Sequence, residues 1–411
     1  MKYVTFFVWA LCLALTPLAL HAQDRGAITA QFNDWLGTTI WPIAQQNGVS
    51  RATFEAALSG VTPKWDLPDL VYAGKPADTN QRQAEFRTPA AYFDARALSN
   101  NANTGRSLMT RHADTLRRIE QQTGVPAQII VAIWGRESSF GNAQIPHDAF
   151  QILSTKGFLS TRADYFTSEL IAALVMVERG FATRNALKSS WAGALGQPQF
   201  MPSNYLQYAA DGNGDGRADI WGSPEDTLAS IGVYLQKHGW QAGRDWGFEV
   251  TVPETVSCAY EGPDQARKIQ DWAAMGITRV SGNAFPSPEI SENGFLLMPA
   301  GRLGPAFIVT SNFTALKAYN ESDAYALFVG HVGDRMKYGS GGFSGAWGTL
   351  DRLSRADITT LQQRLERQGY DVGGADGLVG NKTRRSIGAW QTQNGLTATC
   401  TPSRALLAAI Q

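Results

Sequence analysis

The side chain best suited to acid–base chemistry in this chain is the carboxylate of Glu137. The pattern around it predicts a helix that begins at Pro126, whose fixed φ suits a first turn, and ends at Gly141. Three large apolar residues share the predicted helix face with Glu137: Ile130, Ile133 and Trp134. Poor solvation on such a face raises the pKa of a carboxylate, as a general acid near neutral pH requires. The alternative is an ordinary ion pair with Arg136 or with a more distant basic residue.

A second motif has the spacing of a calcium-binding loop. Oxygen-bearing residues alternate along residues 211–219, with glycine at the sixth position. The predicted ligands are Asp211, Asn213, Asp215, the carbonyl group of Arg217, and Asp219. The twelfth position, where a bidentate carboxylate normally completes the shell, is Gly222, although Glu225 and Asp226 follow closely. The sequence leaves two alternatives, a weak structural Ca²⁺ site and a hydrated turn without metal.

The elements that must position these groups are mostly helices. Residues 32–48 form a helical pattern that ends at Gly48, and Ser50 is a predicted N-cap of the next helix. Further helices are predicted for residues 168–179, ending at Gly180, and for residues 227–237, ending at Gly239. Residues 250–318 carry β-branched and aromatic residues between Pro and Gly signals, which indicates a small lobe with strands.

Composition favours a multidomain protein without a dominant charge. A chain of 411 residues is too long for one ordinary core, so two or three domains are expected. Lys plus Arg and Asp plus Glu both number 36, and no overall field favours nucleic acid or anionic lipid. We therefore expect local sites to determine binding, and no nucleic-acid partner.

The first 22 residues have the pattern of a secretory signal peptide. Lys2 precedes an apolar stretch from Val4 to Leu15, and a small residue, Ala22, marks the expected cleavage point. Cys12 lies inside the apolar stretch and not at the cleavage point, so we expect a released periplasmic protein without a lipid anchor. An uncleaved membrane anchor is the alternative, but the apolar run is short for a span.

Two cysteines, Cys258 and Cys400, remain after removal of the signal peptide. They could pair in an oxidising compartment. Because they fall in different predicted domains, we expect two unpaired cysteines instead. Neither has metal-type spacing, and the five histidines do not cluster.

Three segments resemble the lytic murein transglycosylase B family. They are Gly124-Val125-Pro126 leading to Glu137-Ser138-Ser139-Phe140-Gly141, Arg162-Ala163-Asp164-Tyr165-Phe166, and residues 190–205, which read SWAGALGQPQFMPSNY. The resemblance extends from about residue 30 to Met336. It implies a mainly α (α+β) protein with a lysozyme-like catalytic domain, a helical N-terminal region and a small β-containing lobe. It also implies cleavage of peptidoglycan glycan strands between N-acetylmuramic acid and N-acetylglucosamine, with 1,6-anhydromuramoyl ends.

The resemblance assigns roles to individual residues. Glu137 matches the catalytic acid of the family. The expected substrate-binding residues are Arg162, Ser190, Gln199, Tyr319, Asn320 and Tyr325. Arg162 matches the second of two adjacent arginines in the family, and Thr161 replaces the first, so one charged contact is missing here.

The last 55 or so residues resemble a small three-helix peptidoglycan-binding domain. Four apolar positions are predicted to form its miniature core: Leu361, Leu365, Ile387 and Trp390. A flexible Gly/Ser-rich linker, residues 338–352, is expected to separate it from the catalytic region, residues 23–337. The C-terminal domain then spans residues 353–411, and the alternative is that it serves only as a spacer.

A two-carboxylate glycosidase needs a second Asp or Glu, and none accompanies Glu137 in the matched motifs. A single acid suffices if the substrate's 2-acetamido group stabilises the positive centre and its 6-hydroxyl attacks C1. No cofactor is then required for the chemistry. The expected partner is peptidoglycan and the expected state is a monomer, with other cell-wall enzymes as further partners. A hydrolytic muramidase and a non-catalytic wall-binding protein are the alternative functions.

Overall fold

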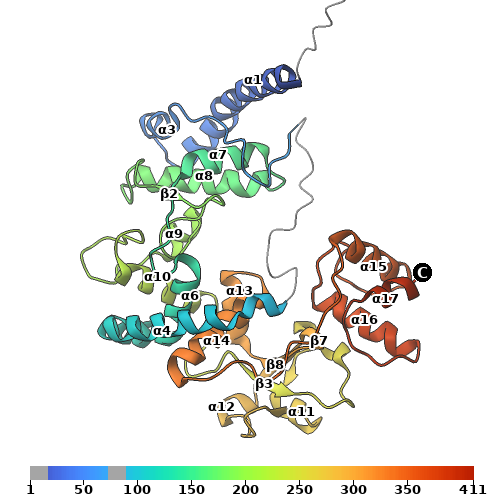
Figure 1. Ribbon diagram of the computed structural model, residues 1–411. Coiled ribbons are helices and arrows are strands. Elements are labelled where there is room, and N and C mark those ends of the chain that lie inside the picture. The colour runs from blue at the N-terminus through green and yellow to red at the C-terminus, as the bar shows by residue number, and fades with distance from the viewer. Residues whose placement is uncertain (1–16, 73–88) are drawn as a thin grey trace, which may run out of the picture. The chain divides into compact units, whose positions relative to one another are not determined.

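The computed structural model describes residues 17–72 and 89–411, with side chains from Arg25 onward (Figure 1). The chain divides into two compact units, which we describe separately. Of the described residues, the first unit contains 17–72 and Ile145–Gln207, and the second contains 89–144 and Tyr208–Gln411. Most of the predicted signal peptide lies outside the described residues. Within the described residues, no helix combines the length and the apolar character that crossing a membrane requires.

The first unit is helical. Its elements are α1 (Pro17–Trp35), the π-helix η1 (Leu36–Ile40), α2 (Trp41–Gln46), α3 (Arg51–Leu58), β1 (His147–Asp148), α7 (Ala149–Leu159), α8 (Ala163–Glu178), β2 (Lys188–Ser189) and α9 (Pro202–Tyr208). The Ser50 side chain accepts a hydrogen bond from Thr53 N and caps α3, as predicted. Helices α7 and α8 pack side by side (Figure 1). Strand β1 pairs antiparallel with β2. Helix α8 begins at Ala163, five residues before the predicted start.

The second unit has a helical part around α6 (Ala127–Ser138). Helix α6 packs against α4 (Ala95–Arg111), α5 (Ala113–Thr123), α10 (Pro224–Lys237) and α14 (Asp323–Tyr338). The remaining elements of this part are η3 (Pro89–Phe93) and α13 (Ser311–Tyr319). Residues 128–135 of α6 are all buried, so this helix lies in the core of the unit and its C-terminal end carries Glu137.

The predicted β lobe is an antiparallel sheet with strand order β4-β6-β8-β3-β5. Its elements are β3 (Gly247–Thr251), η4 (Cys258–Tyr260), η5 (Pro263–Gln265), β4 (Arg267–Lys268), α11 (Ile269–Ala274), β5 (Thr278–Arg279), α12 (Ser287–Ile290), β6 (Asn293–Leu297), β7 (Pro299–Arg302) and β8 (Ala306–Val309). In the register, Ile308 of β8 lies opposite both Phe248 and Leu296. These residues and the fully buried Trp272 fill one core cluster.

Three helices form the C-terminal part: α15 (Arg355–Arg367), α16 (Asn381–Gln393) and α17 (Arg404–Ala409). Ser354 and Asp357 form a capping box at the start of α15. The four apolar residues predicted to form a miniature core are buried together, with Val372, Leu406 and Ile410 added. A mainly α fold with a small β lobe is therefore confirmed.

The prediction of unpaired cysteines is wrong. Cys258 in η4 forms a disulfide with Cys400, which joins the β lobe to the C-terminal helices. A methyl group on Gly388 of α16 would lie 2.2 Å from Cys400 Sγ, so this position requires glycine. The two domains were expected to be separate, but both sulfur atoms belong to one core cluster that includes residues of both.

The segment after α14, predicted to be a flexible linker, makes ordered contacts with the rest of the second unit. Ser344 N and Gly345 N donate to the two carboxylate oxygens of Glu249, at 3.0 and 2.7 Å. Phe343 packs against His331, with ring centroids 4.0 Å apart, and Trp347 stacks on Phe93. The segment contains aromatic residues as well as Gly and Ser, and these pack on rings of the helical part. Together with the hydrogen bonds to Glu249, they attach the segment to the helical part and to the sheet.

Candidate active site

The end of α6 positions Glu137. Pro126 is the N-cap of α6, and the three apolar residues predicted to share a face with Glu137 are each 2% exposed or less. The helix stops at Ser138 because Ser139 and Phe140 both adopt positive φ, at 50° and 59°. The predicted stop at Gly141 therefore comes three residues late.

The turn after Glu137 folds back onto its own helix. The Phe140 ring packs edge-to-face on Trp134, and a methyl group on Gly135 would lie 2.5 Å from the Phe140 ring. Ser138 Oγ accepts from Gly141 N at 3.0 Å. These contacts compensate the cost of two consecutive left-handed residues, a strain that commonly marks functional sites.

Helix α14 supplies the hydrogen-bond partner of Glu137. Ser322 caps this helix through Tyr325 N, which places Tyr325 in its first turn. The Tyr325 hydroxyl donates to Glu137 Oε1 at 2.5 Å. The ring of Tyr319, at the end of α13, lies parallel to that of Tyr325 with centroids 6.4 Å apart. Tyr319 also contacts the ring of Tyr234 from α10, with centroids 4.8 Å apart.

This environment raises the pKa of Glu137 from 4.5 to about 7. Burial of the carboxylate is the main cause, and the Tyr325 hydroxyl and Arg136 oppose it. Burial and the nearby Glu137 also raise the pKa values of Tyr319 and Tyr325, which therefore stay neutral hydroxyls. A carboxyl group with a pKa near neutrality can hold a proton and release it, which general acid–base catalysis demands.

Arg136 does not form the ion pair that was the alternative for Glu137. Its guanidinium donates to the Tyr92 hydroxyl at 2.5 Å and lies over the rings of Tyr92 and Phe328. Arg136 acts on Glu137 only as a nearby positive charge. The structure thus brings Glu137, Tyr319 and Tyr325 together in the second unit, with the exposed Asn320 directly after Tyr319.

The other three residues predicted to bind substrate lie in the first unit. Ser190 Oγ accepts from Ala194 N at 3.2 Å, in a turn of the SWAGALGQ segment. Gln199 has φ of 54° and donates from Nε2 to Gly196 O. Arg162 is exposed, and its guanidinium lies 4.2 Å from the Tyr165 ring centroid. Their roles toward substrate stay predictions.

Trp191 is a candidate that the sequence analysis missed. Its side chain is 52% exposed, although tryptophan is usually buried. Behind it, the buried Lys156 places its ammonium 4.9 Å from the Trp191 ring and 2.6 Å from Asp69. Its place directly after Ser190 in the matched motif could have pointed to Trp191. The exposure of its side chain depends on the tertiary structure, which the motif alone does not give.

Comparison with known proteins decides the family. Residues 31–334 match the family described as Transglycosylase SLT domain, and residues 354–410 match the family described as Putative peptidoglycan binding domain. The chain belongs to the transglycosylase SLT family. The expected resemblance to lytic murein transglycosylase B is also confirmed, since the chain is 32% identical to the membrane-bound lytic murein transglycosylase B of Escherichia coli over 237 residues. That match covers 57% of this chain and 64% of the relative's length.

Solved structures of SLT transglycosylases extend the match to both parts of the chain. SltB3 from Pseudomonas aeruginosa in complex with NAG-anhNAM-pentapeptide is 35% identical and has a TM-score of 0.81, with 92% of this chain and 99% of that chain covered. The Escherichia coli lytic transglycosylase Slt35 in complex with calcium is 27% identical and has a TM-score of 0.57, with 76% and 93% covered. The lysozyme-like fold expected for the family is confirmed by these neighbours.

The predicted calcium loop of this SLT transglycosylase is closed by its own hydrogen bonds. Asp211 accepts from Gly214 N and Gly216 N, and Asp215 Oδ1 accepts from Arg217 N. Asp226, which is fully buried, accepts from the amides of Gly212, Asn213 and Asp219. Among the described residues, no three His, Cys, Asp or Glu side chains are grouped to hold a metal ion.

The two acidic residues that follow the missing twelfth ligand, Glu225 and Asp226, have other partners. Glu225 Oε1 lies 3.2 Å from His112 Nδ1. The Asp226 carboxylate already accepts hydrogen bonds from backbone amides of the loop, such as Asp219 N. The loop therefore offers the alternating oxygen ligands of a calcium site without the bidentate carboxylate that tightens it. The residues fit a weak site, and no part of the chemistry at Glu137 involves it.

Proposed function

We propose that this chain is a lytic murein transglycosylase that cleaves peptidoglycan glycan strands between N-acetylmuramic acid and N-acetylglucosamine. The observation that carries the proposal is the buried carboxyl group of Glu137, which accepts a hydrogen bond from the neutral Tyr325 hydroxyl and has a pKa of about 7. No second Asp or Glu accompanies Glu137 in the matched motifs, and the hydrogen-bond partner found for its side chain is the Tyr325 hydroxyl. This supports a mechanism with one acid and a substrate-derived nucleophile.

In the first step Glu137 donates its proton to the glycosidic oxygen as the bond to C1 breaks. The carbonyl of the muramoyl 2-acetamido group stabilises the positive centre at C1. In the second step the 6-hydroxyl of the same sugar attacks C1, and the Glu137 carboxylate accepts the hydroxyl proton. The catalyst returns to its starting state, and the product carries a 1,6-anhydromuramoyl end without addition of water.

Further residues are proposed to position the sugar. Tyr319, which lies near Glu137, and the following Asn320 are candidates to orient the acetamido group. Ser190 and Gln199, from the matched motif of the first unit, are proposed to contact the glycan. The product form NAG-anhNAM-pentapeptide named for the SltB3 complex supports the anhydro product. The C-terminal helices are proposed to bind peptidoglycan, as their family description indicates.

The disulfide supports a location outside the reducing cytoplasm. Disulfides persist in the periplasm and are rare in cytosolic proteins. We therefore propose that the chain works in the periplasm, where its substrate lies. Calcium is proposed only as an optional structural ligand of the loop at Asp211.

The test is substitution of Glu137 by Gln. The amide keeps the shape but cannot donate the proton, so the lysis rate of purified sacculi should fall at least 1000-fold, within the range of general acid catalysis. Binding to sacculi should persist. Because folding raises the pKa of this carboxyl group from 4.5 to about 7, its contribution to stability is lost as the pH rises between these values. The variant lacks this loss and should melt no lower than the parent at pH 8. Lysis above a tenth of the parent rate would exclude Glu137 as the catalytic acid.

A further inference from the structure

Tyr325 lies in the least restrained turn of α14. The first amides of a helix have no carbonyl partner inside the helix, so the first turn depends on contacts from outside. Helix α14 begins at Asp323, which places Tyr325 in this turn. The N-cap Ser322 accepts from Tyr325 N at 3.4 Å, which is long for a hydrogen bond. The cap alone therefore holds this turn weakly, although its tyrosine donates to Glu137.

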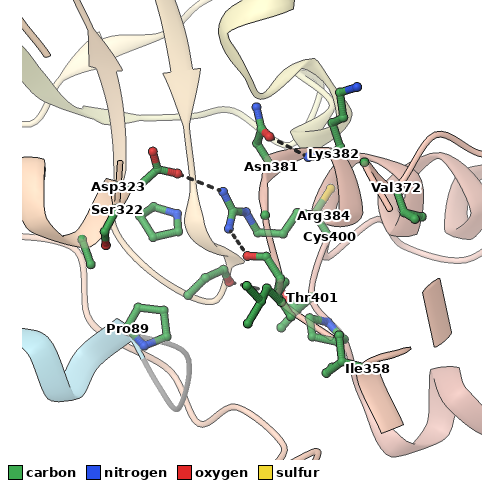
Figure 2. Close-up of a pocket in the computed structure, with 18 of the residues that line it drawn as sticks. Pro89, Ser322, Asp323, Ile358, Val372, Asn381, Lys382, Arg384, Cys400 and Thr401 are labelled. Atoms are coloured by element: carbon green, nitrogen blue, oxygen red, sulfur yellow. Dashed lines mark hydrogen bonds and ion pairs between the residues drawn. The ribbon is translucent and has the colours of Figure 1, made fainter. Parts of the chain in front are cut away.

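The Asp323 carboxylate joins this turn to two other elements. Its Oδ1 lies 2.6 Å from Lys317 Nζ of α13, and its Oδ2 lies 3.9 Å from Arg384 Nη2 of α16. Figure 2 shows Asp323 and Arg384 pointing toward each other, and both line the pocket that is drawn there. A carboxylate in the first turn also interacts favourably with the helix dipole. One side chain thus anchors the start of α14 to α13 and to the C-terminal helices.

Arg384 gives Asp323 a fixed partner. Its side chain is 5% exposed and donates to both carboxylate oxygens of the fully buried Glu261, with Nε to Oε2 at 2.9 Å. The disulfide between Cys258 and Cys400 joins the same C-terminal helices to the β lobe. Because Glu261 and the disulfide hold α16 on the lobe, the guanidinium has a defined position from which it can orient the Asp323 carboxylate.

Lys317 connects the same carboxylate to the second tyrosine near Glu137. Lys317 lies in the last turn of α13, two residues before Tyr319. The rings of Tyr319 and Tyr325 lie parallel, with centroids 6.4 Å apart. The ion pair of Lys317 with Asp323 therefore joins the end of α13 to the start of α14, where the two rings are carried.

We propose that Asp323 is a positioning residue for the reaction, which holds the Tyr325 hydroxyl on Glu137 and links the C-terminal helices to the catalytic acid. Asp323 acts through Tyr325 and not by contact with the reacting atoms. The inference rests on the proposed function, in which Glu137 is the acid. It gives the C-terminal helices an effect at the acid, through Arg384, in addition to their attachment to the polymer.

The pH dependence of cleavage reports the position of the Tyr325 hydroxyl. This hydroxyl lowers the pKa of Glu137, so a poorly placed hydroxyl leaves that pKa higher. The falling limb of kcat/KM against pH then lies at higher pH. Titratable and charged groups from several elements act on Glu137 or on its tyrosine neighbours. They are Arg136 of α6, Tyr234 of α10, Tyr319 of α13, Tyr325 of α14 and Tyr92 of η3.

The experiment measures kcat/KM of the full chain on soluble glycan fragments across the pH range. Asp323→Asn keeps the shape of the side chain without its charge, and Asp323→Glu restores the carboxylate. Lys317→Met removes one partner of Asp323 and gives a result whether or not Asp323→Asn folds. The matched control is Asp114→Asn, which removes an exposed first-turn aspartate of α5 and its ion pair with Arg117.

The falling limb should move to higher pH by at least about 0.3 pH units in Asp323→Asn and in Lys317→Met. Asp114→Asn should keep the parent profile, and Asp323→Glu should return most of the way to it. An effect of charge alone differs, because loss of a carboxylate lowers the pKa of a nearby acid and loss of an ammonium group raises it. Shifts of opposite sign in Asp323→Asn and Lys317→Met would therefore overturn the proposal, as would an unmoved limb in Asp323→Asn.

Combination with Tyr325→Phe tests the route of the effect. If Asp323 acts through the Tyr325 hydroxyl, Asp323→Asn should add no further shift in the Tyr325→Phe protein, whereas independent effects add. A full additional shift would overturn the proposal. If Glu137→Gln still lysed sacculi, the proposed function itself would fail. An inactive Glu137→Gln protein with an unmoved limb in Asp323→Asn would reject this inference alone, so the two failures are distinguishable.

Discussion

The Tyr325 hydroxyl donates a 2.5 Å hydrogen bond to Glu137 Oε1, between side chains 188 residues apart in the sequence. This bond favours the charged carboxylate, whereas burial favours the protonated acid. Burial dominates, and the pKa of about 7 is the balance between the two. Tyr325 therefore limits how far the pKa of Glu137 rises.

Tyr325→Phe should move the pH dependence of cleavage. The parent's kcat/KM should fall as the pH rises through about 7, because Glu137 must be protonated to act as the acid. Removing the hydroxyl removes an interaction that lowers the pKa, so the falling limb of the variant should lie at higher pH. Rates on soluble glycan fragments between pH 5 and 9 measure this. A falling limb that stays at the parent pH or moves to lower pH would contradict the conclusion that the Tyr325 hydroxyl lowers the pKa of Glu137.

Trp191→Ala should weaken the use of long glycan strands. An exposed indole supplies a flat apolar face against which a sugar ring can pack, and the contact removes apolar surface from water. We expect KM on polymeric glycan to rise roughly three- to tenfold. Trp191→Phe is the control and should keep most of the affinity. Equal KM values for the parent and Trp191→Ala would mean that this surface does not contact the glycan.

Calcium should stabilise the chain slightly through the loop at Asp211. A ligand at ten times its dissociation constant adds about 1.4 kcal/mol, which corresponds to a rise of a few degrees in Tm. Asp215→Asn should remove the response to millimolar calcium, and magnesium is the control ion. No shift in the parent protein would show that the loop is a turn without metal.

Arg384→Met should strongly destabilise the attachment of the C-terminal helices. It would leave the fully buried Glu261 carboxylate without its partner, and breaking one side of a buried ion pair costs about 3–5 kcal/mol. The double variant Arg384→Met with Glu261→Met should recover much of that free energy of unfolding. Urea denaturation of the three proteins measures this, and equal stability of the single variant and the parent would show that the pair is not desolvated as described.

The local elements were predictable because short-range patterns specify them. Ser50 as an N-cap, the apolar face of α6 and the miniature core around Leu361 follow from spacing alone. The end of α6 was misplaced because Ser139 and Phe140 take positive φ, which non-glycine residues rarely do and which depends on Phe140 packing.

The attachment of the C-terminal helices was not predictable from composition. Gly339 to Gly345 has linker character, but Glu249 of the sheet binds its amides. The partner of Cys258 lies 142 residues away, so only the fold shows that the pair meets. Truncation at Leu353 would consequently remove Cys400 and Arg384 and leave Glu261 buried without its ion-pair partner. Adsorption experiments on a truncated chain therefore test stability as well as binding.

The central claim is that Glu137 drives an intramolecular transglycosylation. Its most direct test is mass spectrometry of the muropeptides released from purified sacculi by the full chain in ¹⁸O-labelled water. We predict products that end in 1,6-anhydromuramic acid, lighter by one water than hydrolysis products and free of ¹⁸O. Reducing muramic acid ends that carry ¹⁸O at C1 would contradict the account and make the protein a hydrolytic muramidase.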